Sequence, residues 1–203
     1  MATTTPNYGW PVPTSTDYVK DGATAIEALG DAIDATVFGL GSSALTLVKT
    51  QAVGSAVSNV TVTGAFNSSY TNYLIMYTDG VGSIAYSELR LQLSGITANY
   101  YSNLVYTGWT SGGPSVLRTG SQAEWQLIGA MSPNGGVLNV TVTNPNIAKY
   151  KSISGRDIEM NSTMNTGGTD GFCASTSTAT GFVLSAATGT ITGGTIRVYG
   201  YAN

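Results

Sequence analysis

The stretch Glu88-Leu-Arg-Leu-Gln-Leu93 carries the pattern that decides the fold of this 203-residue chain. Its three leucines alternate with charged or amide side chains, so in an extended strand the leucines all point to one face. The same period of two recurs at 60–63, 138–143 and 196–199. Because one face of each segment is apolar and the other polar, each predicts a strand with one buried and one solvated face.

Clusters of glycine and other turn-forming residues separate these segments. They are Asp79-Gly80, Ser111–Pro114, Pro133–Gly136, Thr166–Gly168 and Thr192–Gly194. We expect roughly eight or nine strands after residue 45, with no helices between them. That spacing predicts a mainly β protein whose C-terminal part is an antiparallel, jelly-roll-like β-sandwich.

Residues 21–40 form the one convincing helix of the sequence. Thr24-Ala-Ile-Glu27 has the form of a capping box, which satisfies free backbone N–H groups at a helix start. Residues with a/d heptad spacing follow: Ile26, Leu29, Ile33, Thr36 and Leu40. The helix either packs on its own domain or joins copies of itself around an axis. Isoleucine at the a positions is compatible with three strands, so we expect a short trimerising neck.

The first 20 residues hold three of the six prolines of the chain. Prolines oppose regular helix and strand pairing, so this segment predicts an extended peptide without a core of its own. One interpretation is a disordered tail. The other is a peptide whose aromatic and proline side chains dock on another surface. The candidate docking residues are Pro6, Asn7, Tyr8, Trp10, Pro11, Pro13 and Tyr18.

Composition divides the chain into an extended peptide (1–20), a helical neck (21–44) and a β-sandwich head (45–203). Charged residues make up only 9% of the sequence, with a net charge of −3 and eight scattered Lys and Arg residues. Without a basic patch to neutralise phosphates, we expect no nucleic acid partner. No apolar run approaches the roughly 20 residues of a membrane span, so we expect no membrane insertion.

Two segments resemble virion proteins of tailed bacteriophages. Residues 7–37, NYGWPVPTSTDYVKDGATAIEALGDAIDATV, resemble the N-terminal segment of tail-fibre-like, minor tail and decoration proteins. Residues 181–201, GFVLSAATGTITGGTIRVYGY, resemble the C-terminal strands of phage fibre heads. The resemblance implies a homotrimer made in the host cytoplasm and placed on the virion surface. Its first 20 residues would dock on phage capsid or tail structural proteins.

The resemblance leaves two functions open. In the first, the protein is a tail fibre or spike whose head contacts the host cell surface. In the second, it is a capsid decoration or head-fibre protein without an essential receptor. An exposed, aromatic-lined patch on the head favours the first function. Insertion of the N-terminal peptide between capsid subunits favours the second.

The sequence offers little for catalysis. It contains no histidine, the commonest general base and metal ligand. The single Cys173 predicts a buried strand position. Asp157 and Glu159 are two residues apart, so on a strand they share a face, and we favour a surface strand edge over a cation site or a catalytic pair. We therefore expect a non-enzymatic protein with no catalytic residue, cofactor or metal.

Four aromatic residues crowd into ten positions of the head, among few charges. They are Tyr100, Tyr101, Tyr106 and Trp109. Flat aromatic rings beside amides and hydroxyls are typical of sugar-binding faces, so these residues are candidates for contact with a host surface glycan. The alternative is that the rings fill the sandwich core or a subunit interface.

Overall fold

The computed structural model describes residues 3–14, 18–40, 44–110, 113–160 and 165–202. The chain divides into two compact units, Met1–Ala44 and Leu45–Asn203. Within the described ranges, no helix has the length and apolar character needed to cross a membrane.

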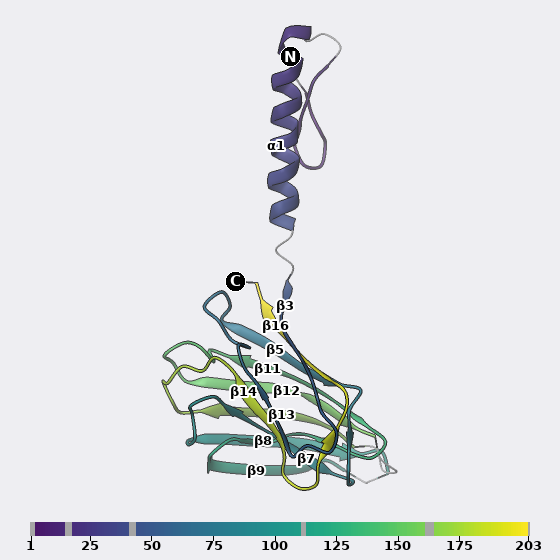
Figure 1. Ribbon diagram of the computed structural model, residues 1–203, viewed down its shortest axis with the longest axis vertical. Helices are drawn as coiled ribbons and strands as arrows, with labels where there is room; N and C mark the ends of the chain where they lie inside the picture. Colours follow the sequence, from purple (N-terminus) through teal and green to yellow (C-terminus); the bar gives the residue numbers. More distant parts are fainter. Residues whose placement is uncertain (1–2, 15–17, 41–43, 111–112, 161–164, 203) are drawn as a thin grey trace. The chain divides into compact units, whose positions relative to one another are not determined.

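The first unit is built around one helix, α1 (Gly22–Leu40) (Figure 1). A 3₁₀ turn, η1 (Val19–Asp21), runs directly into it. Helical structure therefore begins before Thr24, which lies inside the helix and not at its start. The capping box expected at Thr24–Glu27 is wrong for this reason.

A small hairpin precedes the helix. β1 (Thr3–Thr4) pairs with β2 (Pro11–Val12), so Thr4 lies opposite Pro11. The Thr5 amide donates to the Trp10 carbonyl at 2.9 Å and closes the hairpin. The expected block on strand pairing by Pro11 is therefore wrong. Proline is tolerated here because it is the first residue of a two-residue edge strand, where a missing N–H costs little.

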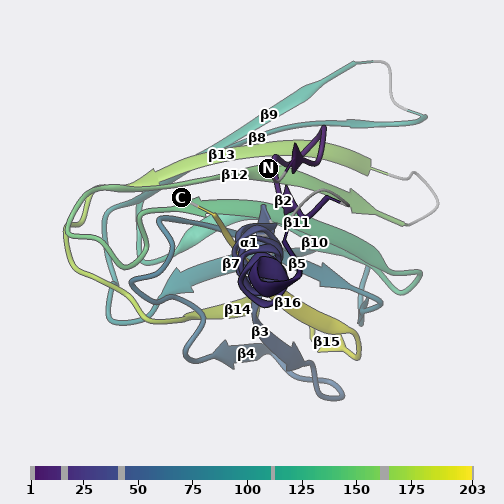
Figure 2. The ribbon, with the colours of Figure 1, turned by 90° about the horizontal axis from the view of Figure 1, so that it is seen from above.

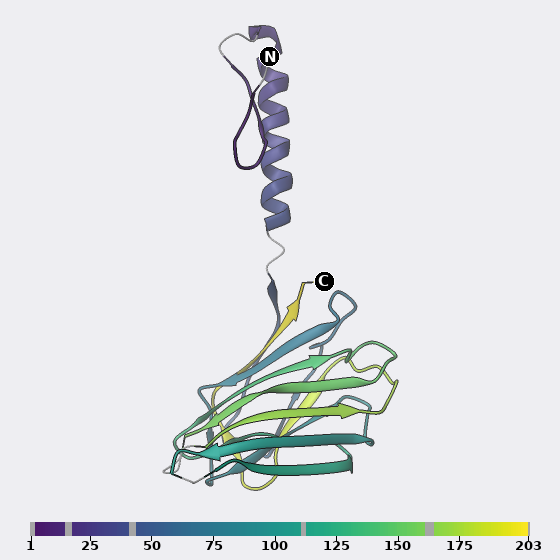
Figure 3. The same cartoon turned by 180° about the vertical axis from the view of Figure 1, so that it is seen from behind.

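The hairpin packs on the helix within this unit, as Figures 1 and 3 show from opposite sides. The Trp10 indole Nε1–H donates to the Thr36 hydroxyl at 2.9 Å, and that hydroxyl donates to the Ala32 carbonyl at 2.8 Å. Tyr8 stacks on the Trp10 ring, with centroids 5.1 Å apart. The N-terminal segment is thus ordered against its own helix.

The second unit is an antiparallel β-sandwich, as expected from the sequence. Its larger sheet has the strand order β3-β16-β5-β11-β12-β13-β8-β9. In that order the strands are Leu45–Ala52, Thr195–Tyr201, Asn72–Thr78, Gly136–Thr143, Lys151–Glu159, Asn165–Cys173, Tyr100–Gly108 and Ser115–Gln122. Figure 2 shows β8 and β9 at one margin of this sheet.

The smaller sheet has the strand order β10-β7-β14-β4. In that order the strands are Trp125–Met131, Ser87–Leu93, Phe182–Ala186 and Asn59–Val62. A separate pair joins the two-residue strands β6 (Val81–Gly82) and β15 (Ile191–Thr192). Every strand pair in the described part of the head is antiparallel.

The core lies between the two sheets and follows the period of two. Leu89, Leu91 and Leu93 of β7 are fully buried, and they join one apolar cluster with Ile75 of β5 and Val140 of β11. Because alternate residues of β5, β7 and β11 meet this cluster, the buried face fixes the register of these strands. The predicted buried position of Cys173 is confirmed.

The described head contains more strands than the sequence predicts. β9 was not predicted, because its residues do not alternate between apolar and polar types. The expected turn at Thr166–Gly168 lies within β13, so that prediction is wrong. A Cβ on Gly167 would approach Leu104 Cδ1 to 2.8 Å, so this glycine allows close packing and makes no turn. Residues 111–112 of the Ser111–Pro114 cluster lie outside the described residues.

Candidate functional site

A cavity lies between the sheets where β10, the edge strand of the small sheet, crosses the large one. Its volume is about 490 Å³. Side chains from β8, β9, β12 and β13 form one wall, and β10 and the start of β7 form the other. Its lining includes the exposed residues Tyr86 and Leu117, so the cavity opens to solvent, and its size makes it a candidate binding site.

Asp157 of β12 faces this cavity and is only 7% exposed. Its Oδ1 atom has no hydrogen-bond partner within the described structure. Two glycines pack closely against this side chain. A Cβ on Gly129 would lie 3.0 Å from Asp157 Cβ, and a Cβ on Gly167 would lie 3.0 Å from Asp157 Oδ1. The chain therefore leaves space for a buried carboxyl group while leaving one of its oxygens unbonded.

Glu159, two residues along the same strand, is 1% exposed. Its Oε1 accepts a hydrogen bond from the Tyr86 amide at 2.7 Å, and its Oε2 accepts one from Asn165 Nδ2 at 3.1 Å. Tyr86 has a φ of 58°, a backbone conformation that bulky residues rarely adopt. The Glu159 carboxylate thus stabilises a strained residue on the cavity wall.

The expectation of a surface strand edge for Asp157 and Glu159 is wrong. They share a face, as predicted, but β12 is an inner strand of the large sheet and this face points inward. The outward positions belong to Arg156 and to Ile158, which is 43% exposed.

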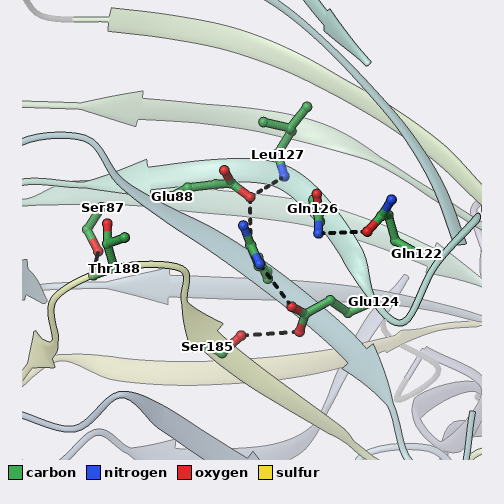
Figure 4. Close-up of polar contacts among 9 residues, drawn as sticks. Ser87, Glu88, Gln122, Glu124, Gln126, Leu127, Ser185 and Thr188 are labelled. Atoms are coloured by element: carbon green, nitrogen blue, oxygen red, sulfur yellow. Dashed lines mark hydrogen bonds and ion pairs between the residues drawn. The ribbon is translucent and has the colours of Figure 1, made fainter. Parts of the chain in front are cut away.

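On the opposite wall, Glu88 of β7 also accepts a hydrogen bond from the amide of a residue with a left-handed backbone (Figure 4). Its Oε1 accepts hydrogen bonds from the Leu127 amide at 3.3 Å and from Arg90 Nε at 2.8 Å. Leu127 also has a left-handed backbone, with a φ of 60°. Arg90 reaches further to Glu124 at 3.4 Å, so it bridges two carboxylates. Strained residues held by specific partners are common at functional sites.

Burial raises the pKa of Asp157 to about 6. Hydrogen bonds from backbone groups, including that of Ala130, act against this shift, whereas the nearby Glu159 carboxylate adds to it. No lysine or arginine is among the described lining residues. The part of the chain that the structure describes holds no cluster of three metal-ligating side chains. The cavity therefore offers the Asp157 carboxyl group as a hydrogen-bond acceptor, and the charge of this group changes with pH near 6.

The predicted aromatic cluster is divided among different surroundings. Tyr100 is fully buried, so its expected contact with a glycan is wrong. Its hydroxyl accepts from the Leu93 amide at 3.1 Å and donates to the Ile96 carbonyl at 3.2 Å. Its ring packs edge-on against Trp125, with centroids 5.0 Å apart. Tyr100 is therefore a core residue.

The other three rings lie outside the core. Tyr106 is half-buried and lines the inter-sheet cavity. Tyr101 points to the other face of β8, where it stacks on Phe172 with centroids 4.5 Å apart. Trp109 follows β8 and is 74% exposed. The structure thus brings only Tyr106 to the cavity and leaves Tyr101 and Trp109 on separate surfaces.

In the first unit, the predicted neck residues divide between two adjoining helix faces. Leu29 and Thr36 are half-buried on the face that carries the Trp10 contact. Ile26 is 65% exposed and Ile33 is 36% exposed on the neighbouring face. Leu40 ends the helix, and its side chain lies outside the described residues.

The predicted docking residues lie in or beside the hairpin. Pro6, Asn7 and Tyr8 are exposed in its turn, and Tyr18 is exposed before η1. The remaining ones, Trp10, Pro11 and Pro13, are half-buried. The exposed residues of the predicted docking set therefore lie in the hairpin turn and at Tyr18.

Sequence reasoning missed the acidic cavity. Asp157 and Glu159 were recognised as a pair, but Glu88, Tyr86 and Asn165 come from distant parts of the chain. The sequence of β12 gave no decisive signal, because its two isoleucines, Ile153 and Ile158, have opposite parity, and only the structure shows that Ile153 and Asp157 share the inner face. Ile153 is buried, which places Asp157 inside as well.

Comparisons with known proteins give no relative. No family model, curated protein or solved structure matches the chain.

Proposed function

We propose that this chain is a non-enzymatic structural component of a phage virion, a homotrimeric surface protein with an N-terminal anchor. The exposed β-sandwich head contacts the host cell surface. The phage origin rests on the resemblance of residues 7–37 and 181–201 to virion proteins. The following features of the two units support the rest of the proposal.

The observation that carries the proposal is the missing core of the first unit. None of its described residues is buried, although its helix is 19 residues long. An isolated helix of this length gains little stability from its backbone alone and depends on packing of an apolar face. The hairpin covers one such face, and the other requires a partner.

A second copy of the same chain is the partner that fits this face. The exposed apolar side chains Ile26, Ile33 and Val37 recur at intervals of seven and four along the helix. Together with Gly30 they form one stripe, which we call the Ile26–Val37 stripe. Apolar residues at such intervals pack between parallel helices, and isoleucine at the a positions is compatible with three of them.

The head supports contact with a host surface through the cavity and through the Tyr101–Phe172 pair. Phe172 is 47% exposed while stacked on Tyr101, so a flat aromatic surface faces solvent. Flat aromatic surfaces bind the apolar faces of sugars and of other rings.

Immunogold labelling of purified virions with antibody against residues 45–203 tests this function. Gold at the tail tip or baseplate is the result we expect for a protein that contacts the host. Gold spread over the capsid would replace host contact with capsid decoration. Absence of gold from all particles would contradict a place in the virion.

A further inference from the structure

We infer that the inter-sheet cavity of the head binds a sugar residue, with Asp157 as the hydrogen-bond acceptor for its hydroxyl groups. This inference rests on the proposed contact between the head and the host surface, and it names the site and the ligand class. The cavity volume of about 490 Å³ falls within the range of about 300–1,000 Å³ typical of small-ligand sites.

The strongest observation is the unbonded oxygen of Asp157. Asp157 lines the cavity and is only 7% exposed. A buried carboxyl oxygen without a donor is costly, because its hydration is lost and nothing replaces it. The accessible area of this oxygen is below 1 Å², so a hydroxyl group can donate to it only if the wall around Gly167 and Leu104 moves aside on binding. The hydrogen bond formed in that way would be charge-assisted.

The other two carboxylates of the cavity already have partners. Glu159 accepts from the Tyr86 amide and from Asn165, and Glu88 accepts from Arg90 and from the Leu127 amide. Their role is to hold the walls in place. This leaves the Asp157 carboxyl as the group that a ligand would complete.

The remaining walls suit a ring with polar edges and apolar faces. Leu104, Leu117 and Leu127 provide apolar surface, and the half-buried Tyr106 provides an aromatic side. Asn165 and Thr166 add neutral polar groups at the same cavity. A sugar ring presents C–H groups on its faces and hydroxyls at its edge, which matches this combination.

Separate hydroxyl groups fit the free hydrogen-bonding capacity of the cavity better than an ammonium group does. An ammonium group has three donors and favours several unpaired acceptors. Arg90 pairs with Glu88 and also with Glu124, and both oxygens of Glu159 accept hydrogen bonds. Among the described residues that line the cavity, Asp157 Oδ1 is the one buried side-chain oxygen without a partner, so a ligand with separate hydroxyl groups is the better match.

The part of the cavity wall that contains Tyr86 and Leu127 is held in place before any ligand binds. Tyr86 and Leu127 both have left-handed backbones, and each donates its amide to a different carboxylate. A preformed site loses less entropy on binding than one that must be ordered by its ligand. Substitutions that disturb these two amides should therefore weaken binding without changing the ligand class.

The test is saturation-transfer NMR and titration calorimetry on the full-length protein at pH 7.5. The probes are methyl glycosides of glucose, galactose, mannose, rhamnose and N-acetylglucosamine, with methylamine as the cationic probe. We expect at least one glycoside to bind and Asp157→Asn to weaken it about tenfold, as loss of a charged hydrogen bond predicts. Tyr106→Ala, which removes the aromatic side, should also weaken it.

Asp170→Asn is the matched control, because Asp170 is an exposed carboxylate on the neighbouring strand β13. It should leave binding unchanged. Three results would overturn the inference: no glycoside binds at millimolar concentration, binding is equal in Asp157→Asn and Asp170→Asn, or methylamine binds and the glycosides do not. Sedimentation of the same samples separates this inference from the proposed assembly, since a monomer that binds a sugar contradicts only the assembly.

Discussion

The two units of this protein differ in how they are stabilised. The head buries side chains from both of its sheets in one continuous core, which includes Trp125, Tyr73 and Phe182. The first unit is a hairpin packed on a single helix, and none of its described residues is buried. The comparison indicates that the head has a core that stabilises it, whereas the first unit has none among its described residues, and the association proposed above would cover its exposed helix face.

The largest expected effect comes from the same truncation made once in each unit. Leu91→Ala removes a fully buried side chain of β7 and should lower the free energy of unfolding of the head by roughly 3 kcal/mol. Leu29→Ala removes a half-buried side chain of α1 and should leave the unfolding of the head unchanged. Urea denaturation followed by circular dichroism measures both variants.

Equal destabilisation of the head by the two substitutions would contradict the division into independently stabilised units. A shift of the head transition by Leu91→Ala alone supports it. Because both variants lose the same atoms, a difference between them comes from the unit in which the leucine lies and from its burial there.

A smaller effect is expected at Asp157. Its pKa is raised from 3.8 to about 6, so between these values the folded state holds a proton that the unfolded state releases. The head should therefore lose stability as the pH rises from about 4 through 6. The groups lining the cavity around Asp157 are Glu159 on its own strand, Glu88 and the hydroxyls of Tyr86 and Tyr106.

Asp157→Asn removes this ionisation, and it should be more stable than the wild type at pH 7.5 by roughly 1–2 kcal/mol. The difference should vanish at pH 4, where the wild-type carboxyl is protonated. Thermal unfolding across this pH range measures it. Asp170→Asn, at an exposed carboxylate, should show no such pH-dependent gain, and a gain of equal size would contradict the assignment to burial.

Much of the fold was predictable because alternation and burial agree in several strands. The predicted segments 60–63, 88–93, 138–143 and 196–199 all fall on strands of the sandwich. In each of them the apolar residues have one parity, so the buried face follows from sequence alone.

The cavity was not predictable, because the strand that carries Asp157 lacks this alternation. β12 has Ile153 at one parity and Ile158 at the other, so the pattern gives no unique inner face. The inner position of Asp157 depends on its neighbours β11 and β13, which pair with it across distant turns. The partners Tyr86 and Asn165 are brought to Glu159 only by the tertiary fold.

The helix and the spacing of its apolar residues were predicted from the sequence. Which of these residues face the hairpin and which are exposed was not predicted. The hairpin residue Trp10 contacts Thr36, one of the expected neck positions. The heptad pattern alone does not separate a residue that meets its own hairpin from one that meets another chain. Exposure in the folded unit shows which residues the hairpin covers, because Leu29 and Thr36 are half-buried whereas Ile26 and Ile33 are exposed.

The smallest expected effect lies in the first unit. Trp10→Phe keeps an aromatic ring but loses the hydrogen bond to Thr36, which should weaken the hairpin–helix contact by about 1 kcal/mol. Amide hydrogen exchange should then be faster in residues 3–14, with the head unchanged. Trp109→Phe, at an exposed tryptophan of the head, is the control. Unchanged exchange in Trp10→Phe would show that this bond does not stabilise the hairpin.

The most direct test of the central claim is sedimentation velocity of the full-length protein and two double variants. Ile26→Asp with Ile33→Asp places charges on the Ile26–Val37 stripe, where association would bury them unpaired. Ala28→Asp with Ala35→Asp has the same spacing but lies on the opposite, exposed side of the helix. We predict that the wild type and the alanine variant sediment as trimers and the isoleucine variant as a monomer with a folded head. A wild type that is monomeric at micromolar concentration, or an isoleucine variant that stays trimeric, would contradict the account.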